Sequence, residues 1–194
     1  MADQLQLYFS SLDGANVSHI AGNASDKVKA FVADLSIYYR VNHPELKATF
    51  CDYIIPRIKV TEVSVLNNAE EPLKAEGRVV CSLTVEEDMV NASKNLHGGC
   101  SSFLVDMDVC STLALSALSL ETTGKPHYTV SQLISVVYHS PATLGDELRI
   151  VNTSLTLGSR AVSAKTEIYN ATHHRLVVSG THIKMQASPQ KSKL

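Results

Sequence analysis

The sequence has almost no excess of charge of either sign, and this limits the partners it can have. Its 17 lysines and arginines nearly balance its 19 acidic residues, so the formal net charge is −2. A chain this close to neutral makes no strong electrostatic field toward the phosphates of nucleic acid. With 44% hydrophobic and 19% charged residues, it has an ordinary globular composition. We therefore expect a globular protein with no nucleic-acid partner.

Long apolar runs are also missing from the sequence. A membrane-spanning helix needs about 18 to 20 consecutive apolar residues. The longest candidate, residues 100–120, is interrupted by Asp106, Asp108 and six hydroxyl residues. Residues 1–10 lack the basic and apolar regions of a signal peptide. These absences predict no membrane span and no secretion signal.

Cysteine is scarce, and its spacing excludes the common zinc and redox motifs. None of Cys51, Cys81, Cys100 and Cys110 belongs to a Cys-x-x-Cys pair, so we expect reduced thiols in an intracellular protein. The paired His173-His174 has no cysteine or carboxylate at the spacing of metal ligands. The sequence therefore predicts no metal site, and it indicates no cofactor.

Glycine and proline are absent between Gly99 and Gly124, where the sequence favours one long central helix. Apolar residues recur there at helical spacing, at positions 103, 107, 110, 114 and 117. Asp106 lies beside this stripe, where a carboxylate is costly unless it is paired or used. His97-Gly98-Gly99 comes directly before the helix, and a helix start offers unpaired N–H groups to a negative oxygen. Gly98 and Gly99 allow close approach of the backbone to a ligand.

The remaining pattern predicts an α+β protein with an antiparallel sheet. We expect residues 1–22 to be loosely ordered and one helix to run from Ser25, as N-cap, to about Arg40. Alternating residues predict strands over 54–66, 78–86, 128–138, 147–157, 161–169 and 176–185, with a bulge near Thr61 and Glu62. Short breaks between strands favour antiparallel neighbours, and the sheet must wrap the one apolar helix to bury both surfaces. The predicted parts are an extension with one helix (1–50), the main domain (51–186) and a flexible tail (187–194).

The sequence ends in Ser192-Lys193-Leu194. This tripeptide at a free C-terminus is a peroxisomal address that an import receptor recognises. The polar residues before it, with Pro189, favour an accessible tail. We therefore expect a peroxisomal protein that binds the import receptor; the alternative is a coincidental polar tail.

Several short motifs follow one another in a distinctive order: Asn91-Ala92, Leu96-His97-Gly98-Gly99, Leu104-Val105-Asp106, Val130-Ser131, Tyr138-His139-Ser140-Pro141-Ala142 and Leu144-Gly145-Asp146. Through these motifs the sequence over residues 54–185 resembles the hotdog-fold acyl-CoA thioesterases, in the branch of the phenylacetyl-CoA (PaaI-like) enzymes and the small thioesterase-superfamily proteins. The resemblance implies a hotdog fold, in which an antiparallel sheet wraps one long central helix, and hydrolysis of an acyl-CoA to the free acid and coenzyme A. It also implies a homodimer or homotetramer whose sites form between two subunits.

The resemblance implies a role for each matching residue. Asn91 would lie near the thioester or the attacking water, and His97 would brace the loop near the thioester carbonyl. Gly98, next to Gly99, would donate its N–H to the oxyanion. Asp106 would be the general base or nucleophile, and Ser131 would help to place the water. Each also has a structural reading, in which these side chains only close turns or face solvent. On the same grounds, Arg160 and Lys184 would either bind phosphates of coenzyme A or be solvated surface residues.

The sequence departs from the family pattern after the aspartate, where residues 105–112 contain an apparent two-residue insertion. If the family carboxylate is located by its spacing after His97, it is Asp106. If it is located by its spacing before residues 110–112, it is Asp108. Two residues turn a helix by about 200°, so only one carboxylate can face the site, and the helix start favours Asp106. Two alternative functions stay open: a catalytically silent acyl-CoA-binding hotdog protein, and a hotdog enoyl-CoA hydratase or dehydratase. The peroxisomal address would suit a fatty or branched acyl substrate from lipid metabolism.

Overall fold

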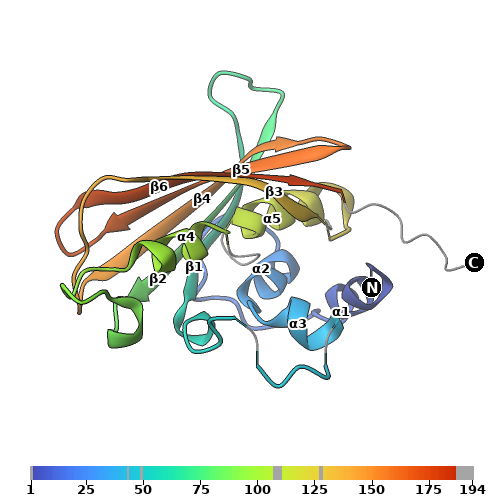
Figure 1. Ribbon diagram of the computed structural model, residues 1–194. Coiled ribbons are helices and arrows are strands. Elements are labelled where there is room, and N and C mark those ends of the chain that lie inside the picture. Colours follow the sequence, from blue (N-terminus) through green and yellow to red (C-terminus); the bar gives the residue numbers. More distant parts are fainter. Residues whose placement is uncertain (1, 43, 49, 107–110, 127–128, 187–194) are drawn as a thin grey trace, which may run out of the picture.

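The computed structural model describes residues 2–42, 44–48, 50–106, 111–126 and 129–186. Within them, six antiparallel strands form one sheet in the order β1-β2-β4-β5-β6-β3 (Figure 1). The strands are β1 (Lys59–Asn67), β2 (Ala75–Thr84), β3 (Val130–Tyr138), β4 (Glu147–Leu157), β5 (Ala161–Asn170) and β6 (Arg175–Met185). The expected bulge is present, since the register of β1 on β2 shifts between Val60 and Glu62.

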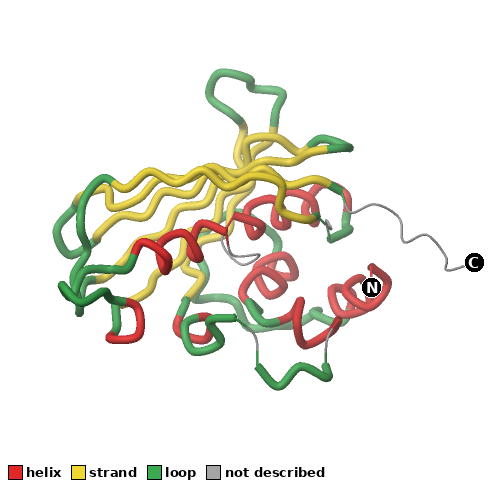
Figure 2. Tube along the Cα trace, viewed as in Figure 1, coloured by secondary structure: helices red, strands yellow, loops and turns green. Residues whose placement is uncertain are grey.

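The sheet curves over the central helical region, as Figure 2 shows. This region is described as α4 (Gly98–Asp106) and α5 (Ser111–Thr123), and residues 107–110 lie outside the described part of the chain. Helix α5 is buried almost all round, since nine of its ten residues from Ser111 to Leu120, all but Thr112, are buried. The sheet covers one side of the helix and α2 packs on another. Gly77 permits this closeness: a Cβ there would lie 2.0 Å from the Ala114 carbonyl oxygen. The predicted hotdog arrangement is confirmed.

One predicted strand neighbour is wrong. The short break between β3 and β4 suggested a hairpin, but β3 pairs with β6 and β4 pairs with β2. The connection over residues 139–146 therefore crosses from one part of the sheet to another. As a result, β3 is an edge strand, beside α4.

The N-terminal extension is more ordered than we expected. It contains three helices, α1 (Ala2–Ser10), α2 (Asp26–Ala33) and α3 (Ile37–Asn42), where the sequence predicted a loose lead and one helix. Leu5 and Phe9, one helical turn apart on α1, are buried, and the Phe9 ring lies edge-on to Phe31 of α2 at 5.8 Å. Two buried residues are too few to give a helical periodicity that can be recognised in the sequence.

The expected single helix from Ser25 breaks at Asp34. The Asp34 carboxylate accepts hydrogen bonds from Tyr8 Oη at 2.6 Å and Ser36 Oγ at 3.2 Å and pairs with Arg40, so it holds a turn between α2 and α3. Ser25 does occupy the N-cap position, but its hydroxyl donates to Glu121 of α5 and not to its own helix.

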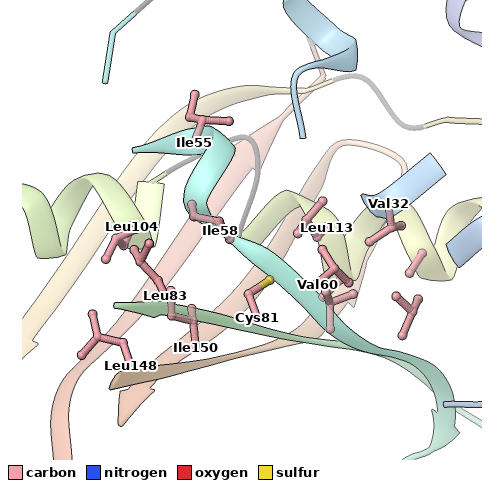
Figure 3. Close-up of a cluster of buried hydrophobic side chains, with 14 of the residues drawn as sticks. Val32, Ile55, Ile58, Val60, Cys81, Leu83, Leu104, Leu113, Leu148 and Ile150 are labelled. Atoms are coloured by element: carbon pink, nitrogen blue, oxygen red, sulfur yellow. The ribbon is translucent and has the colours of Figure 1, made fainter. Parts of the chain in front are cut away.

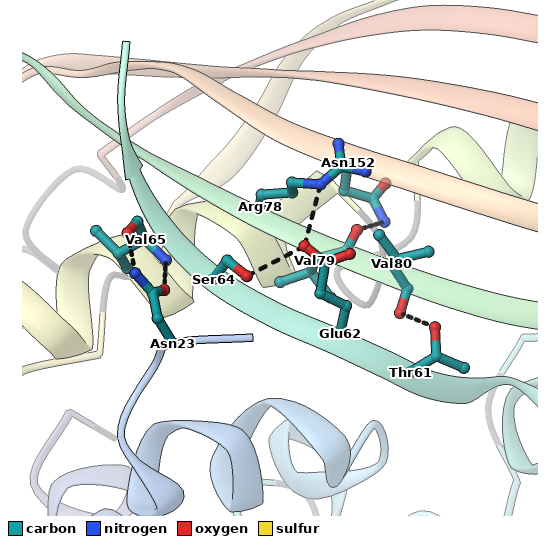
Figure 4. A network of polar contacts seen from close by, with 9 residues as sticks. All are labelled: Asn23, Thr61, Glu62, Ser64, Val65, Arg78, Val79, Val80 and Asn152. Atoms are coloured by element: carbon teal, nitrogen blue, oxygen red, sulfur yellow. Dashed lines mark hydrogen bonds and ion pairs between the residues drawn. The ribbon is translucent and has the colours of Figure 1, made fainter. Parts of the chain in front are cut away.

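The extension and the sheet share one hydrophobic core. Asn23 donates to the Val65 carbonyl oxygen and accepts from the Val65 N–H, both at 2.8 Å, and thereby docks the extension on β1 (Figure 4). Val32 of α2 lies close to Val60 and Leu113 in the cluster of Figure 3. In the same network as Asn23, Glu62 pairs with Arg78 across β1 and β2. The boundary predicted at residue 50 therefore divides the chain but not the core.

Candidate active site

The loop before α4 is closed by its own side chains. The Asn91 Oδ1 atom accepts hydrogen bonds from the N–H groups of Ser93, at 2.9 Å, and Asn95, at 3.2 Å. Asn91 N–H in turn donates to the Asn95 carbonyl oxygen. Asparagine favours such turns because its short side chain can satisfy nearby N–H groups. The Asn91 oxygen thus has a structural role, and its amide nitrogen lies on an exposed loop.

His97 acts as the side-chain cap of α4. Its Nδ1 atom accepts a hydrogen bond from the Gly99 N–H at 2.9 Å. A Cβ at position 99 would lie only 3.0 Å from this nitrogen, so glycine suits the cap. This cap uses the N–H of Gly99, the second residue of the helix. Among the described residues, none accepts a hydrogen bond from the N–H of Gly98, the first residue of the helix. The start of α4 therefore presents the Gly98 N–H at the positive end of a helix dipole.

Tyr138, at the end of β3, holds this helix start in place. Its hydroxyl donates to the Gly98 carbonyl oxygen at 3.1 Å and lies 2.8 Å from Ser102 Oγ. The helix start and the end of the edge strand are thereby tied together. A shallow cavity of about 320 Å³ lies here, between Gly98, Tyr138 and residues 139–142.

Asp106 lies at the opposite end of α4, beside the start of β3. Its Oδ1 atom accepts a hydrogen bond from Ser131 Oγ at 3.4 Å and lies 3.7 Å from His182 Nε2. Half of the side chain is exposed (50%). Asp106 also lines a cavity of about 430 Å³. The predicted pair of Asp106 and Ser131 is thus brought together by α4 and β3.

His182 of β6 completes this end of the site, and the sequence reasoning missed it. The side chain is fully buried (0% exposed). Its Nε2 atom lies 2.9 Å from Ser131 Oγ, and its Nδ1 atom lies 2.7 Å from Ser111 Oγ at the start of α5. A polar chain therefore runs from Ser111 through His182 and Ser131 to Asp106. The available signal was the alternation of β6, which turns His182 toward the helices.

Lys184, two residues further along β6, is not on the surface where we expected it. It is 1% exposed, and its Nζ atom donates to Thr112 Oγ1 of α5 at 2.8 Å. This interior position contradicts a contact with phosphates at the surface. Arg160 is exposed in the turn between β4 and β5, so its contact with coenzyme A stays a prediction. Asp108, the other candidate carboxylate, lies outside the described residues.

Within one chain the two halves of the site stay apart. Gly98 and Asp106 are the first and last residues of α4, and a rise of about 1.5 Å per residue separates them by about 12 Å. One reacting carbon cannot lie within about 3 Å of both groups. The structure thus joins Asn91, His97 and Gly98 at one end, and Asp106, Ser131 and His182 at the other.

Comparison with known proteins decides the family. No model of a protein family matches the chain. Acyl-coenzyme A thioesterase 13 of Homo sapiens is 32% identical over 110 residues, which are 57% of this chain and 74% of that protein. The same protein of Mus musculus is 31% identical over the same shares. The chain belongs to the hotdog-fold acyl-CoA thioesterases.

Solved structures agree with the fold of this thioesterase-family chain. Thioesterase superfamily member 2 of zebra fish superposes with a TM-score of 0.59 at 23% identity, covering 85% of this chain and 99% of that one. A hypothetical thioesterase of Streptococcus pneumoniae, solved with coenzyme A, gives 0.54 at 19% identity over 70% and 90% of the two chains. At these identities the likeness supports the fold alone.

Nucleophilic thiol chemistry does not suit this thioesterase site. Cys100 lies in the first turn of α4, where a helix dipole favours the thiolate. Burial has the larger effect, however, and together with Cys51 and Asp88 it raises the pKa of the Cys100 thiol to about 12. Among the described residues, no group of three or more histidine, cysteine or acidic side chains is placed to hold a metal ion. The carboxylate of Asp106 and the start of α4 are therefore the groups with usable chemistry.

Proposed function

We propose that the protein hydrolyses acyl-CoA thioesters at a site shared by two copies of the chain. The observation that carries this proposal is the split of the site along α4. Gly98 presents its N–H at one end and Asp106 its carboxylate at the other. A two-fold dimer would bring the Asp106 end of one chain to the Gly98 end of its partner.

The edge strand β3 supports this dimer. Its outer edge has no partner strand among the described residues, and its exposed large apolar residues are Val130, Leu133, Val137 and Tyr138. An exposed apolar edge is a template for pairing with another chain. If two β3 strands pair antiparallel, Ser131 at the start of one lies toward Tyr138 at the end of the other. Both ends carry site residues, so a single contact would complete two sites.

The proposed chemistry needs only groups that such a dimer would supply. A water oxygen attacks the thioester carbonyl carbon while the Asp106 carboxylate takes its proton. Ser131, held by His182, orients the water. The Gly98 N–H of the partner stabilises the oxyanion. Collapse of the tetrahedral intermediate breaks the C–S bond, and the coenzyme A thiolate leaves and takes up a proton.

The geometry argues against the hydratase alternative. That reaction needs a second acid–base group that reaches the acyl chain. His182 lies near Asp106, but it is fully buried and both ring nitrogens contact serine hydroxyls. It is therefore placed to position Ser131 and not to touch substrate.

Thiol release from a panel of acyl-CoAs tests the function and the base together. Wild type should release coenzyme A, and Asp106→Asn should lower kcat by about 10²- to 10⁴-fold, as loss of a general base does. Asp108→Asn is the matched control and should stay near wild type. Loss of turnover only in Asp108→Asn would assign the base to that residue. Binding of acyl-CoA without wild-type turnover would support the silent alternative.

We also propose that Ser192-Lys193-Leu194 directs the protein to peroxisomes, where fatty or branched acyl-CoAs would be its substrates. These residues lie outside the described part of the chain, and the tripeptide itself supports the proposal. Residues 187–194 appended to a fluorescent protein should carry it into peroxisomes in cultured cells. A matched fusion with Leu194→Ala should remain in the cytosol. Equal distributions of the two fusions would contradict the proposal.

A further inference from the structure

Phe50, from the N-terminal extension, lies at the candidate active site. It lines the cavity of about 430 Å³ together with Phe103 and Asp106 of α4 and Ile134 and Val136 of β3. Gly99 and Ser102 complete the described lining. The cavity therefore has one carboxylate, two small residues and four apolar side chains. A residue that precedes the sheet in sequence thus contributes to the site.

An aromatic pair forms one wall of this cavity. The rings of Phe50 and Phe103 meet edge to face, with centroids 5.5 Å apart and an interplanar angle of 75°. This is a favoured geometry, because the positive edge of one ring meets the negative face of the other. Phe103 precedes Asp106 by three residues, so the two lie on the same side of α4. The aromatic wall therefore stands next to the carboxylate.

The segment that carries Phe50 is firmly held. Arg57 reaches from it to Asp88, with Nη2 2.6 Å from Oδ2, and to Glu86, with Nη1 2.5 Å from Oε2. Its Nε atom also donates to the Tyr53 carbonyl oxygen at 2.8 Å. Asp88 lies in a short 3₁₀ helix, Glu87–Met89, that is followed directly by the Asn91 loop, so this clamp links the segment after Phe50 to the candidate active site.

The backbone after Phe50 is fixed as well. Ile55 and Ile58 are buried in the core beside Leu104 of α4 (Figure 3). Cys51 has a φ of 59°, a conformation that residues other than glycine rarely adopt. Its carbonyl oxygen accepts a hydrogen bond from the Ile54 N–H at 2.9 Å, which closes the turn. The position of Phe50 is thus set by the packed residues that follow it.

Phe50 is nevertheless 78% exposed, although it is a large apolar side chain. In the single chain most of this residue is therefore uncovered, and the part that lines the cavity is available to a ligand. An acyl group bound with its carbonyl near Asp106 would extend along the apolar wall and cover this ring. A polar ligand would gain nothing from the four apolar side chains.

We propose that Phe50 is a specificity-determining residue that selects apolar acyl groups by their length. This inference rests on the proposed thioesterase function and deepens it. The N-terminal extension is then part of the acyl site as well as part of the core. Phe50 acts by contact with the acyl chain and takes no part in the reaction.

Steady-state kinetics with straight-chain acyl-CoAs, from acetyl to palmitoyl, test the proposal. Phe50→Ala should lower kcat/KM for the preferred acyl-CoA by about 10-fold, mainly through KM, because it removes apolar contact from bound substrate. The acyl chain length that the variant prefers should increase, because the smaller alanine side chain leaves more room in the cavity. For acetyl-CoA, kcat/KM of the variant should stay within about twofold of wild type, since the single methyl group of an acetyl group makes little contact with Phe50. Phe50→Trp should shift the preference to shorter chains.

Tyr53→Ala is the matched control. Tyr53 lies on the same segment and is 85% exposed, but it is not among the residues that line the cavity. It should keep the wild-type chain-length profile. Unchanged profiles in both Phe50 variants, with wild type active, would overturn the role of Phe50 and leave the thioesterase function intact. Absence of wild-type turnover on every acyl-CoA would overturn both.

Discussion

Burial decides the chemistry of individual residues in this protein. Lys184 and His182 are polar, yet both lie inside, where they hydrogen-bond the first two residues of α5. Burial is favourable only because those partners are present. Cys100 illustrates the opposite outcome, since its position at a helix start would favour the thiolate, but desolvation outweighs that effect.

Cys100 should therefore be unreactive at neutral pH. With a pKa raised to about 12, the thiol stays protonated, and the thiolate is the reactive form. Alkylation by iodoacetamide, followed at Cys100 by peptide mass spectrometry, should be slow from pH 7 to 9 in the native protein. Unfolding in urea should restore the rate of an ordinary cysteine. A native rate that already rises around pH 8.5, as for a free thiol, would contradict this assignment.

At the scale of elements, the connection from β3 to β4 shows how a short loop crosses the sheet. Asp146 lies at its end and is buried. Its Oδ2 atom accepts hydrogen bonds from the Thr143 N–H and from Asn170 Nδ2, both at 2.7 Å. Burial acts to raise the pKa of Asp146, but the bonds from Thr143 and Asn170, with His173 nearby, hold it below its ordinary value. The ionised form thus fastens the connection to β5.

Asp146 should make stability depend on pH in the acid range. Because the folded pKa is lowered, its stabilisation is present above the unfolded pKa of about 3.9 and is lost as pH falls through the folded value. Asp146→Asn should cost about 1–3 kcal/mol of unfolding free energy at pH 7, and the difference from wild type should shrink below about pH 4. Urea denaturation at several pH values measures the unfolding free energy of both proteins. Glu147→Gln, at an exposed neighbouring carboxylate, is the control and should change little at any pH. An equal loss of unfolding free energy in Asp146→Asn at pH 7 and pH 3 would rule out a stabilisation that depends on the charge of Asp146.

At the scale of the whole molecule, the length of α4 is the reason for proposing a site shared by two chains. The helix separates Gly98 from Asp106 by about 12 Å, and the exposed edge of β3 offers a way to bring these groups together across a two-fold axis. The extension packs on the opposite side of the helices from the sheet, as Figure 1 shows. The edge strand is therefore left open while the core is covered.

A mixture of two inactive variants should regain activity. In a shared site, a chain with Asp106→Asn still supplies the Gly98 end. A chain with Asn91→Ala loses the hydrogen bonds that close the loop before α4 and so disturbs its own Gly98 end, but it still supplies Asp106. A heterodimer then contains one intact site and one doubly altered site. If half the dimers are mixed, turnover should return to about a quarter of wild type. The chains are mixed in denaturant and refolded together, and each variant refolded alone is the control. No recovery in the mixture, with heterodimers present, would place the complete site within one chain.

The sequence by itself determined much of this protein. Alternation and helical spacing are local properties, so they were enough to locate the strands, the central helical region and the bulge in β1. His97, Gly98 and Gly99 were recognisable because a helix start and its cap are built from neighbouring residues. Asp106 and Ser131 were predicted as site residues from the motif order of the family, which also identified the fold.

Only the tertiary structure decided which distant residues meet. The pairing of β3 with β6 depends on a crossing connection, and no local pattern distinguishes it from a hairpin. The depth of His182 and Lys184 depends on which face of β6 the helices cover. Leu5, Phe9 and Phe50 became significant because the extension folds back on the helices, and contacts across so many residues leave no period in the sequence. Spacing along a chain fixes local geometry, whereas burial and contact are properties of the packed molecule.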